Sequence, residues 1–174
     1  MSGKIIGIVI LVSALVAGAA LYYLQVYGYY DEVRQESVAL VSLNSGQSEE
    51  IPADGITAID ADSSPIRFRA CFTTPLSLAF LTESYEMVPD ATPRNAPGWF
   101  SCFDAEAIGT ALDAGGALAF MGQKNVAYGV DRIVAITEDG RGYIWHELND
   151  CGEKAYDGTV VGEECPPRPE TAAD

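Results

Sequence analysis

The sequence lacks most of the residue groupings that catalysis and metal binding require. His146 is the only histidine among 174 residues, and no two of the four cysteines are spaced C-x-x-C. Zinc sites and c-type haem sites normally need several such ligands at short spacing. The glycines of 109–116 fit neither the dinucleotide-binding nor the Walker pattern. The sequence therefore predicts no catalytic group, no bound cofactor and no metal site.

A single histidine can still act as a general base, and His146 follows Trp145 in a segment with strand periodicity. No serine or cysteine nucleophile stands in a recognised context near it. We therefore favour a structural role, in which the two rings pack or form hydrogen bonds across a sheet. An enzyme centred on His146 is kept as the third of three functional hypotheses.

The segment Asp60-Ala61-Asp62-Ser63-Ser64 begins like a calcium-binding loop, with oxygen-bearing side chains at alternate positions. An EF-hand then requires a glycine and, later, a bidentate glutamate, but Pro65 and Cys71 occupy these positions. The segment therefore does not predict an EF-hand, and only a calcium site of another kind stays open.

Positive charge is also scarce, because 10 lysines and arginines face 25 acidic residues. The whole chain has a net charge of −15. The part after the apolar N-terminal segment, which does not include Lys4, has a net charge of −16. Such a surface repels nucleic acid and anionic lipid head groups, and it attracts a basic partner, for instance a carrier of the cytochrome c type. The acids are scattered, so solubility or adaptation to a salty medium is the simpler interpretation.

No charged side chain stands anywhere in residues 5–30. An α-helix rises ~1.5 Å per residue, so roughly 20 apolar residues cross the hydrocarbon core of a bilayer. The sequence therefore predicts a transmembrane helix over 5–30. Aromatic residues at its far end are typical of a membrane-interface belt: Tyr22, Tyr23, Tyr27, Tyr29 and Tyr30.

Charges that flank this helix predict its orientation. Lys4 precedes it, while Asp31 and Glu32 follow it. The positive-inside tendency places residues 1–4 in the cytoplasm and the remainder outside, which in a bacterial inner membrane is the periplasm. The alternative is a cleaved secretory signal sequence, which the small residues of 17–20 support. It is disfavoured because the chain stays apolar and aromatic over 21–27.

One face of the predicted span carries small residues at spacings of three and four: Gly7, Ser13, Ala14, Ala17 and Gly18. Pairs of small residues four positions apart allow another helix to approach closely. Small residues are common in membrane spans and often mean nothing. We nevertheless expect a helix partner here, because the exported part offers no other explanation for an anchor.

All the cysteines follow the predicted span: Cys71, Cys102, Cys151 and Cys165. An even number of cysteines outside the cytoplasm predicts two disulfides. Three connectivities are possible. We favour Cys71–Cys102 and Cys151–Cys165, because each bond then closes a local segment.

Residues 31–165 are predicted to form one α+β domain, mostly antiparallel, with one short helix. It begins with a linker or a last helical turn over 31–37 and is followed by a disordered tail over 166–174. Asp104 predicts the N-cap of a helix over 105–113, and Asp139-Gly140 predicts a hairpin turn. Alternating apolar residues predict the strands, and prolines predict a loop over 87–99. The strands are expected at 38–43, 56–59, 66–72, 76–80, 117–121, 126–128, 131–137 and 143–148.

Five segments together carry a resemblance: Leu21-Tyr22-Tyr23-Leu24-Gln25-Val26-Tyr27, Tyr128-Gly129-Val130-Asp131-Arg132, Asp139-Gly140-Arg141-Gly142, Trp145-His146 and Cys151-Gly152-Glu153. With these segments the chain resembles a family of small membrane-anchored proteins of alphaproteobacteria, known only as a domain of unknown function. The resemblance covers nearly the whole chain. It implies a bacterial, single-span, periplasm-facing protein, and it carries over no active site because none of these motifs is catalytic.

We therefore expect a non-enzymatic accessory subunit, or an assembly or stability factor, of a larger inner-membrane complex of respiratory or photosynthetic electron transport. Its expected partners are that integral membrane complex, reached through the helix, lipid, and a basic periplasmic protein, but not nucleic acid. The alternative is an acidic periplasmic docking module for a basic carrier such as a cytochrome c. The second alternative is a membrane-anchored periplasmic enzyme that uses His146.

Overall fold

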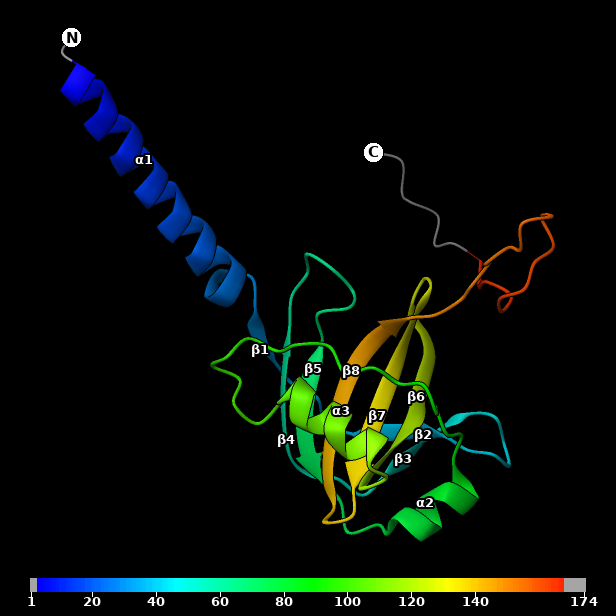
Figure 1. The fold of residues 1–174 in the computed structure, drawn as a ribbon. Coiled ribbons are helices and arrows are strands. Elements are labelled where there is room, and N and C mark those ends of the chain that lie inside the picture. The colour runs from blue at the N-terminus through cyan, green and yellow to red at the C-terminus, as the bar shows by residue number, and fades with distance from the viewer. Residues whose placement is uncertain (1–2, 168–174) are drawn as a thin grey trace.

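An apolar helix projects from a β domain in the structure, a computed structural model that describes residues 3–167 (Figure 1). Helix α1 (Gly3–Tyr23) continues into a short π-helix, η1 (Leu24–Gly28). The combined segment Gly3–Gly28 is long and apolar enough to cross a membrane, and all of Gly3–Tyr23 is exposed. The predicted apolar helix is therefore present. Residues 1–2 and 168–174, which belong to the predicted N-terminal segment and tail, lie outside the described part.

Six strands form the main sheet, and every neighbouring pair is antiparallel. Their spatial order is β1 (Asp31–Val33), β4 (Asp54–Asp60), β5 (Arg69–Thr73), β8 (Arg141–Leu148), β7 (Val130–Thr137) and β6 (Ala117–Ala127). At the predicted β7–β8 turn, Gly140 has φ +81°, and a Cβ there would lie 2.4 Å from the carbonyl oxygen of Thr74. Glycine is therefore required at this turn.

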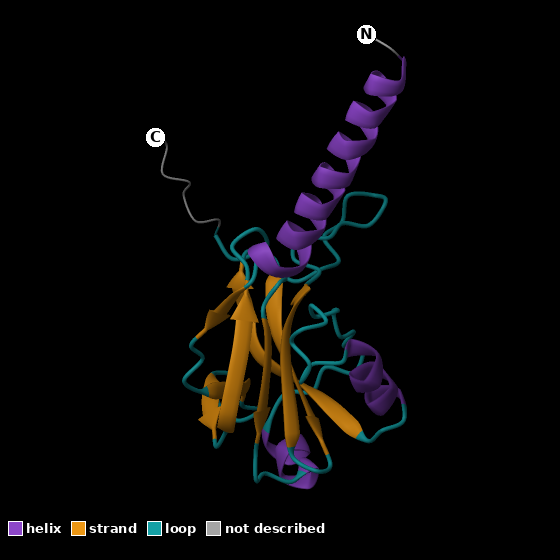
Figure 2. Ribbon diagram, turned by 90° about the vertical axis from the view of Figure 1, so that its left-hand side faces the viewer, coloured by secondary structure: helices purple, strands orange, loops and turns teal. Residues whose placement is uncertain are grey.

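Both faces of the main sheet are covered, so its central strands are buried on both sides (Figures 1 and 2). The ribbon of β2 (Val38–Val41) and β3 (Ser48–Ile51) covers one face, and helix α2 (Leu78–Ser84) closes the same core. Helix α3 (Ala105–Asp113) and the loop 86–104 cover the opposite face, over Trp145. The two cores explain why the middle of β7 (133–136) and of β8 (143–145) is apolar at consecutive positions.

Helix α3 has the predicted bounds, and its N-cap forms as expected. The carboxylate of Asp104 accepts hydrogen bonds from the backbone N–H groups of Glu106 and Ala107, both at 3.1 Å. Such a cap satisfies donors that a helix cannot satisfy itself, and it is typically worth about 1 kcal/mol. Together with the antiparallel sheet and both disulfides, this helix confirms the predicted α+β fold.

The predicted strand at 76–80 is wrong, because this segment lies largely in α2. The hydroxyl of Ser77 accepts a hydrogen bond from the backbone N–H of Phe80 at 3.3 Å and so caps the helix. Leu78 and Leu81, three positions apart, then face the core, while Phe80 points outward. The apolar residues fit a helix of two turns as well as a strand, and the cap decides in favour of the helix.

Long-range pairing changes several other predicted segments. Residues 31–33, expected in a linker, form edge strand β1 against β4. The polar residues 48–51 form β3 against β2. The strands expected at 117–121 and 126–128 join into β6, which bulges near Gln123, and residues 66–68 precede β5 instead of belonging to it. These pairings depend on partners distant in sequence, which local periodicity does not reveal.

Candidate functional site: the junction of the apolar helix and the β domain

The end of the apolar helix is fixed to the β domain by aromatic side chains. The indole Nε1 of Trp99 donates a hydrogen bond to the carbonyl oxygen of Val26 at 2.7 Å. The ring of Tyr30 meets Trp99 edge to face, with centroids 6.3 Å apart. The guanidinium of Arg67 lies 5.6 Å from the centre of the Tyr30 ring. Each such ring contact contributes on the order of 0.5–1 kcal/mol, so the helix end has a defined place on the domain.

Trp99 belongs to the loop 86–104, and Arg69 of strand β5 holds this loop against the sheet. Arg69 is only 4% exposed. Its guanidinium donates to four backbone carbonyls, two in the loop and two in the segment before β5: Arg94 and Asn95 at 2.9 and 3.0 Å, and Ile66 and Phe68 at 2.9 and 2.6 Å. The Trp99 contact with the helix therefore depends on Arg69.

The charge of Arg69 is buried without an ion pair among residues 3–167. Burial lowers the pKa of Arg69 to about 10, and the neighbouring positive charge of Arg94 acts in the same direction. The group therefore stays charged at neutral pH. The carbonyl dipoles of four residues take the place of water around it, as a buried charge requires.

A disulfide and a backbone contact tether the same loop. Cys71, which is buried in β5, is bonded to Cys102, which is exposed near the end of the loop. The backbone N–H of Thr92 donates to a carboxylate oxygen of Glu147 at 2.9 Å. Burial raises the pKa of Glu147, and the hydrogen bond from Thr92 opposes this shift. The loop that carries Trp99 is thus held at Thr92, at Cys102 and by Arg69.

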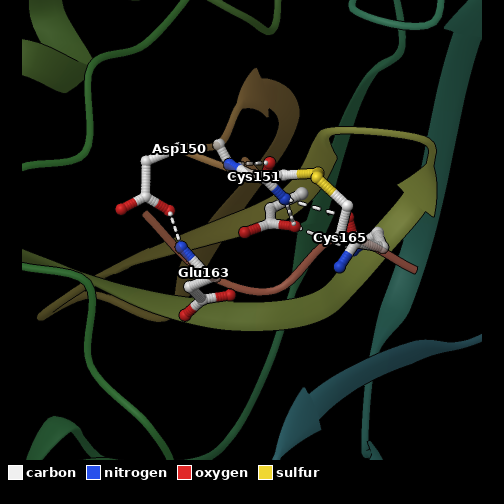
Figure 3. Close-up of a disulfide and its surroundings, with 7 residues drawn as sticks. Asp150, Cys151, Glu163 and Cys165 are labelled. Atoms are coloured by element: carbon white, nitrogen blue, oxygen red, sulfur yellow. Dashed lines mark hydrogen bonds between the residues drawn. A yellow bond between two sulfur atoms is a disulfide. The ribbon is translucent and has the colours of Figure 1, made fainter. Parts of the chain in front are cut away.

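The second disulfide, Cys151–Cys165, closes the segment after β8 (Figure 3). Within this segment, the backbone N–H of Glu163 donates to the carboxylate of Asp150 at 3.3 Å, and Gly152 donates to the carbonyl oxygen of Glu163 at 3.0 Å. The two bonds together account for all four cysteines. The favoured connectivity is therefore confirmed.

A groove of about 690 Å³ opens beside the junction, between the segment 32–36 and the loop residues 99–102. The rings of Trp99 and Phe100 supply apolar surface, and Glu32 and Arg34 place both charge signs on its rim. The outer side of β1 has no strand partner in the described part of the chain. The groove, this free edge and the helix end together form a surface suited to an extended protein segment rather than to chemistry.

Within residues 3–167, the predicted helix-contact residues belong to neither apolar core. Gly7, Ser13, Ala14, Ala17 and Gly18 are all exposed on α1. A Cβ added at Gly7 or Gly18 would meet nothing within 4 Å. Glycine is therefore not required at these positions by any contact among residues 3–167.

The five predicted interface tyrosines divide into two groups. Tyr22, Tyr23, Tyr27 and Tyr29 are exposed, and the rings of Tyr23 and Tyr27 stack with centroids 5.9 Å apart. Tyr30 instead turns toward the domain, where it contacts Trp99 and Arg67. Tyr30 therefore serves the junction, and the other four remain available to surroundings outside the chain.

His146 is held by its neighbours on both ring nitrogens. Its Nδ1 lies 2.7 Å from the carbonyl oxygen of Pro65, and the Nε of Arg132 donates to its Nε2 at 3.1 Å. The imidazole also stacks on Phe68, with ring centroids 4.9 Å apart. Since an arginine can only donate, Nε2 must accept, and the ring is neutral with its proton on Nδ1. This arrangement leaves neither nitrogen of His146 free to act as a general base.

His146 should make the stability of the domain depend on pH. Burial lowers the pKa of His146 below 6.5, and the charge of Arg132 acts in the same direction. Below pH 6.5 the unfolded chain gains a proton that the folded chain resists, so stability is full above pH 6.5 and is lost as pH falls toward the folded pKa. We expect urea midpoints measured between pH 5 and 8 to fall with acid more steeply in the wild type than in His146→Gln. Parallel curves for the two proteins would contradict this.

The possible calcium segment offers little for a cation. Asp60 uses one carboxylate oxygen to accept the backbone N–H of Ala61 at 2.8 Å. No group of three or more His, Cys, Asp or Glu residues suited to a metal ion occurs within residues 3–167.

The sequence alone did not identify Arg69 or Trp99 as residues of the junction. The alternation of Arg67, Arg69 and Cys71 was visible, but it did not tell which face of the strand would be covered. Trp99 lay in a segment that prolines marked only as a loop. Arg69 occupies a polar position of this alternation, so no local signal distinguishes it from an exposed arginine.

The chain was also compared with known proteins. A family model described as "Family of unknown function (DUF6446)" matches residues 38–166. No curated protein and no solved structure matches the chain. The matched region contains the whole β domain from β2 onward, both disulfides, Arg69 and Trp99, but it does not include the apolar helix.

Proposed function

We propose that this chain, which belongs to the DUF6446 family of unknown function, is a non-enzymatic accessory subunit or assembly factor of a larger bacterial inner-membrane complex. The helix α1 would span the membrane once, with its N-terminus in the cytoplasm and the β domain in the periplasm. Respiratory and photosynthetic complexes of electron transport are the proposed class. The acidic domain, with a chain net charge of −15, would then lie beside the extramembrane part of the complex.

The observation that carries this proposal is the isolation of α1. All of Gly3–Tyr23 is exposed, while the β domain completes two apolar cores without any contribution from this helix. Lipid can cover such a helix, but the exposed face of Gly7, Ala14 and Gly18 has the spacing that favours a second helix. We take this face as the contact, so that α1 serves for more than attachment.

The junction supports the same proposal. The bond from Trp99 to Val26 fixes the direction in which the helix leaves the domain, and Arg69 fixes the loop that carries Trp99. Contact through α1 would therefore place the groove beside it at a defined position against a partner. A flexible linker would be sufficient if the helix were only a tether.

Co-purification from native membranes tests this proposal. The tagged full chain is extracted in mild detergent, and its stoichiometric partners are identified by mass spectrometry. Ala14→Leu combined with Gly18→Leu should reduce the recovered partner by roughly tenfold, because bulky side chains separate closely packed helices. The addition should not disturb the chain itself, since a Cβ at Gly18 has open space.

Ala19→Leu provides the matched control, because residue 19 lies on the opposite face of the same helix. It adds the same three carbon atoms as Ala14→Leu alone, with which it is compared, but should leave recovery of the partner unchanged. A wild-type chain that runs as a lone monomer would overturn the proposal. Equal losses in both variants would show that the predicted face is not the contact.

A further inference from the structure

The β domain carries exposed apolar side chains at the end far from α1. Leu43 is 60% exposed and Phe80 is 49% exposed. Both line a hollow of about 510 Å³ between the β2–β3 turn and helix α2. In Figure 1 these two elements lie at the opposite end of the domain from the point where α1 leaves it. We name this surface the distal patch: Leu43, Glu49, Phe80, Glu83 and Tyr85.

The exposure of Phe80 is not a by-product of burying the rest of α2. Leu78 and Leu81 of the same helix already pack against the core, and Leu81 is fully buried. Phe80 instead contacts the edge of Tyr85, with ring centroids 6.4 Å apart. A half-exposed aromatic ring beside an exposed leucine is typical of the apolar centre of a protein interface.

The rim of the distal patch is acidic. Glu49 and Glu83 both line the hollow, and no lysine or arginine is among its described lining residues. Neither carboxylate forms an ion pair within residues 3–167. The hydroxyl of Ser45 donates to Glu49 at 2.6 Å and orients it. Burial raises the pKa of the Tyr85 hydroxyl, and the charge of Glu49 adds to this shift, consistent with a negative local potential.

We propose that the distal patch docks a basic soluble protein, whose lysines or arginines surround an apolar contact with Leu43 and Phe80. A second copy of this chain is disfavoured as the occupant, because two patches with acidic rims repel each other. A membrane surface is disfavoured because the patch lies far from α1. The contact is separate from the one proposed for α1, so either can fail without the other.

Binding of cytochrome c, used as a basic globular probe, tests this proposal. The full chain is placed in nanodiscs of zwitterionic phosphatidylcholine, which give the probe little charge to bind. We expect binding at ~20 mM salt that weakens by at least about tenfold at ~200 mM, because exposed charges are then screened within about a Debye length. Absence of binding at ~20 mM salt would overturn the proposal.

Two double variants with the same net charge separate the patch from overall acidity. Glu49→Lys with Glu83→Lys should weaken binding by roughly tenfold or more, since the rim charges are reversed. Glu153→Lys with Glu164→Lys changes two exposed carboxylates on the Cys151–Cys165 segment and should alter affinity by less than about threefold. Equal weakening by both would overturn the proposal, because it would show attraction to net charge alone.

The variant Phe80→Ala tests the apolar centre of the distal patch. Because Phe80 is exposed, the variant should fold with a nearly unchanged melting temperature. We expect affinity to fall by roughly fivefold to tenfold, with an unchanged dependence on salt, since no charge is removed. A folded Phe80→Ala chain that binds the probe as tightly as the wild type would overturn the apolar part of the contact and, with it, the proposed site.

Discussion

Replacing Arg69 with alanine is expected to lower the free energy of unfolding by about 3–5 kcal/mol. The change removes four hydrogen bonds at once and takes the guanidinium donor away from the carbonyl groups of Arg94, Asn95, Ile66 and Phe68. It also opens a cavity under the loop 86–104. Losses of this kind are among the few mechanisms that give such large effects. Urea unfolding of the full chain in detergent measures the change.

Arg67→Ala is the control for this prediction. Arg67 is only partly buried, and its guanidinium lies 5.6 Å from the centre of the Tyr30 ring, so its loss should cost less than about 1 kcal/mol. Arg69→Lys should remain closer to alanine than to the wild type, because one ammonium group cannot reach carbonyls on both segments. Similar costs for Arg67→Ala and Arg69→Ala would contradict the role assigned to Arg69.

The Arg69→Ala change should also affect the end of the apolar helix, near Val26. Once the loop is released, Trp99 no longer has a fixed position from which to donate to Val26. Amide hydrogen exchange should therefore rise in residues 24–30 and 89–102 of Arg69→Ala, while exchange in β7 changes much less. This pattern would distinguish release of the junction from a uniform loss of stability.

Removal of the Cys71–Cys102 disulfide is expected to have the second largest effect. The cysteines are separated by 31 positions, and the chain-entropy account gives roughly 3–4 kcal/mol for closing a loop of this length. The double variant Cys71→Ser/Cys102→Ser should lose stability of this order in urea unfolding. The loop should also become more mobile, because the bond ties it directly to strand β5.

The Cys151–Cys165 bond supplies the comparison. It closes only 14 positions, in a segment that contributes no residue to either apolar core. Cys151→Ser/Cys165→Ser should therefore release that segment locally and change the main unfolding transition by less than about 1 kcal/mol. If the second pair of substitutions destabilised the domain as much as the first, the assignment of the large effect to the junction loop would be wrong.

Local signals predicted those parts of the fold that depend on neighbouring residues. The N-cap at Asp104 and the Asp139-Gly140 turn involve contacts within a few positions, so α3 and the β7–β8 hairpin have nearly the expected bounds. The strand predicted at 76–80 was wrong because the spacing of its apolar residues is compatible with both a strand and a short helix. The linker predicted to include residues 31–33 was wrong because β1 exists only through its pairing with β4.

Only the part of the candidate site that lies on the apolar helix was predictable from the sequence. The small residues of α1 and the tyrosines after them were visible, because hydrophobicity and residue size along a helix are local properties. The place of Trp99 against Val26 was not, since 73 positions separate the two residues and a loop must fold back to join them. The neutral state of His146 likewise depends on Pro65 and Arg132, which the sheet brings to its ring.

The sequence by itself determined that this chain has an apolar helix, an excess of acidic charge and a mostly antiparallel domain. These follow from composition and short-range periodicity, which hold whatever the chain packs against. Only the tertiary structure decided that Arg69 is buried and holds the loop of Trp99, and that Leu43 and Phe80 line one hollow with Glu49 and Glu83. The physical reason is that burial and proximity depend on which distant segment covers a given face, and the sequence of that face alone does not contain this information.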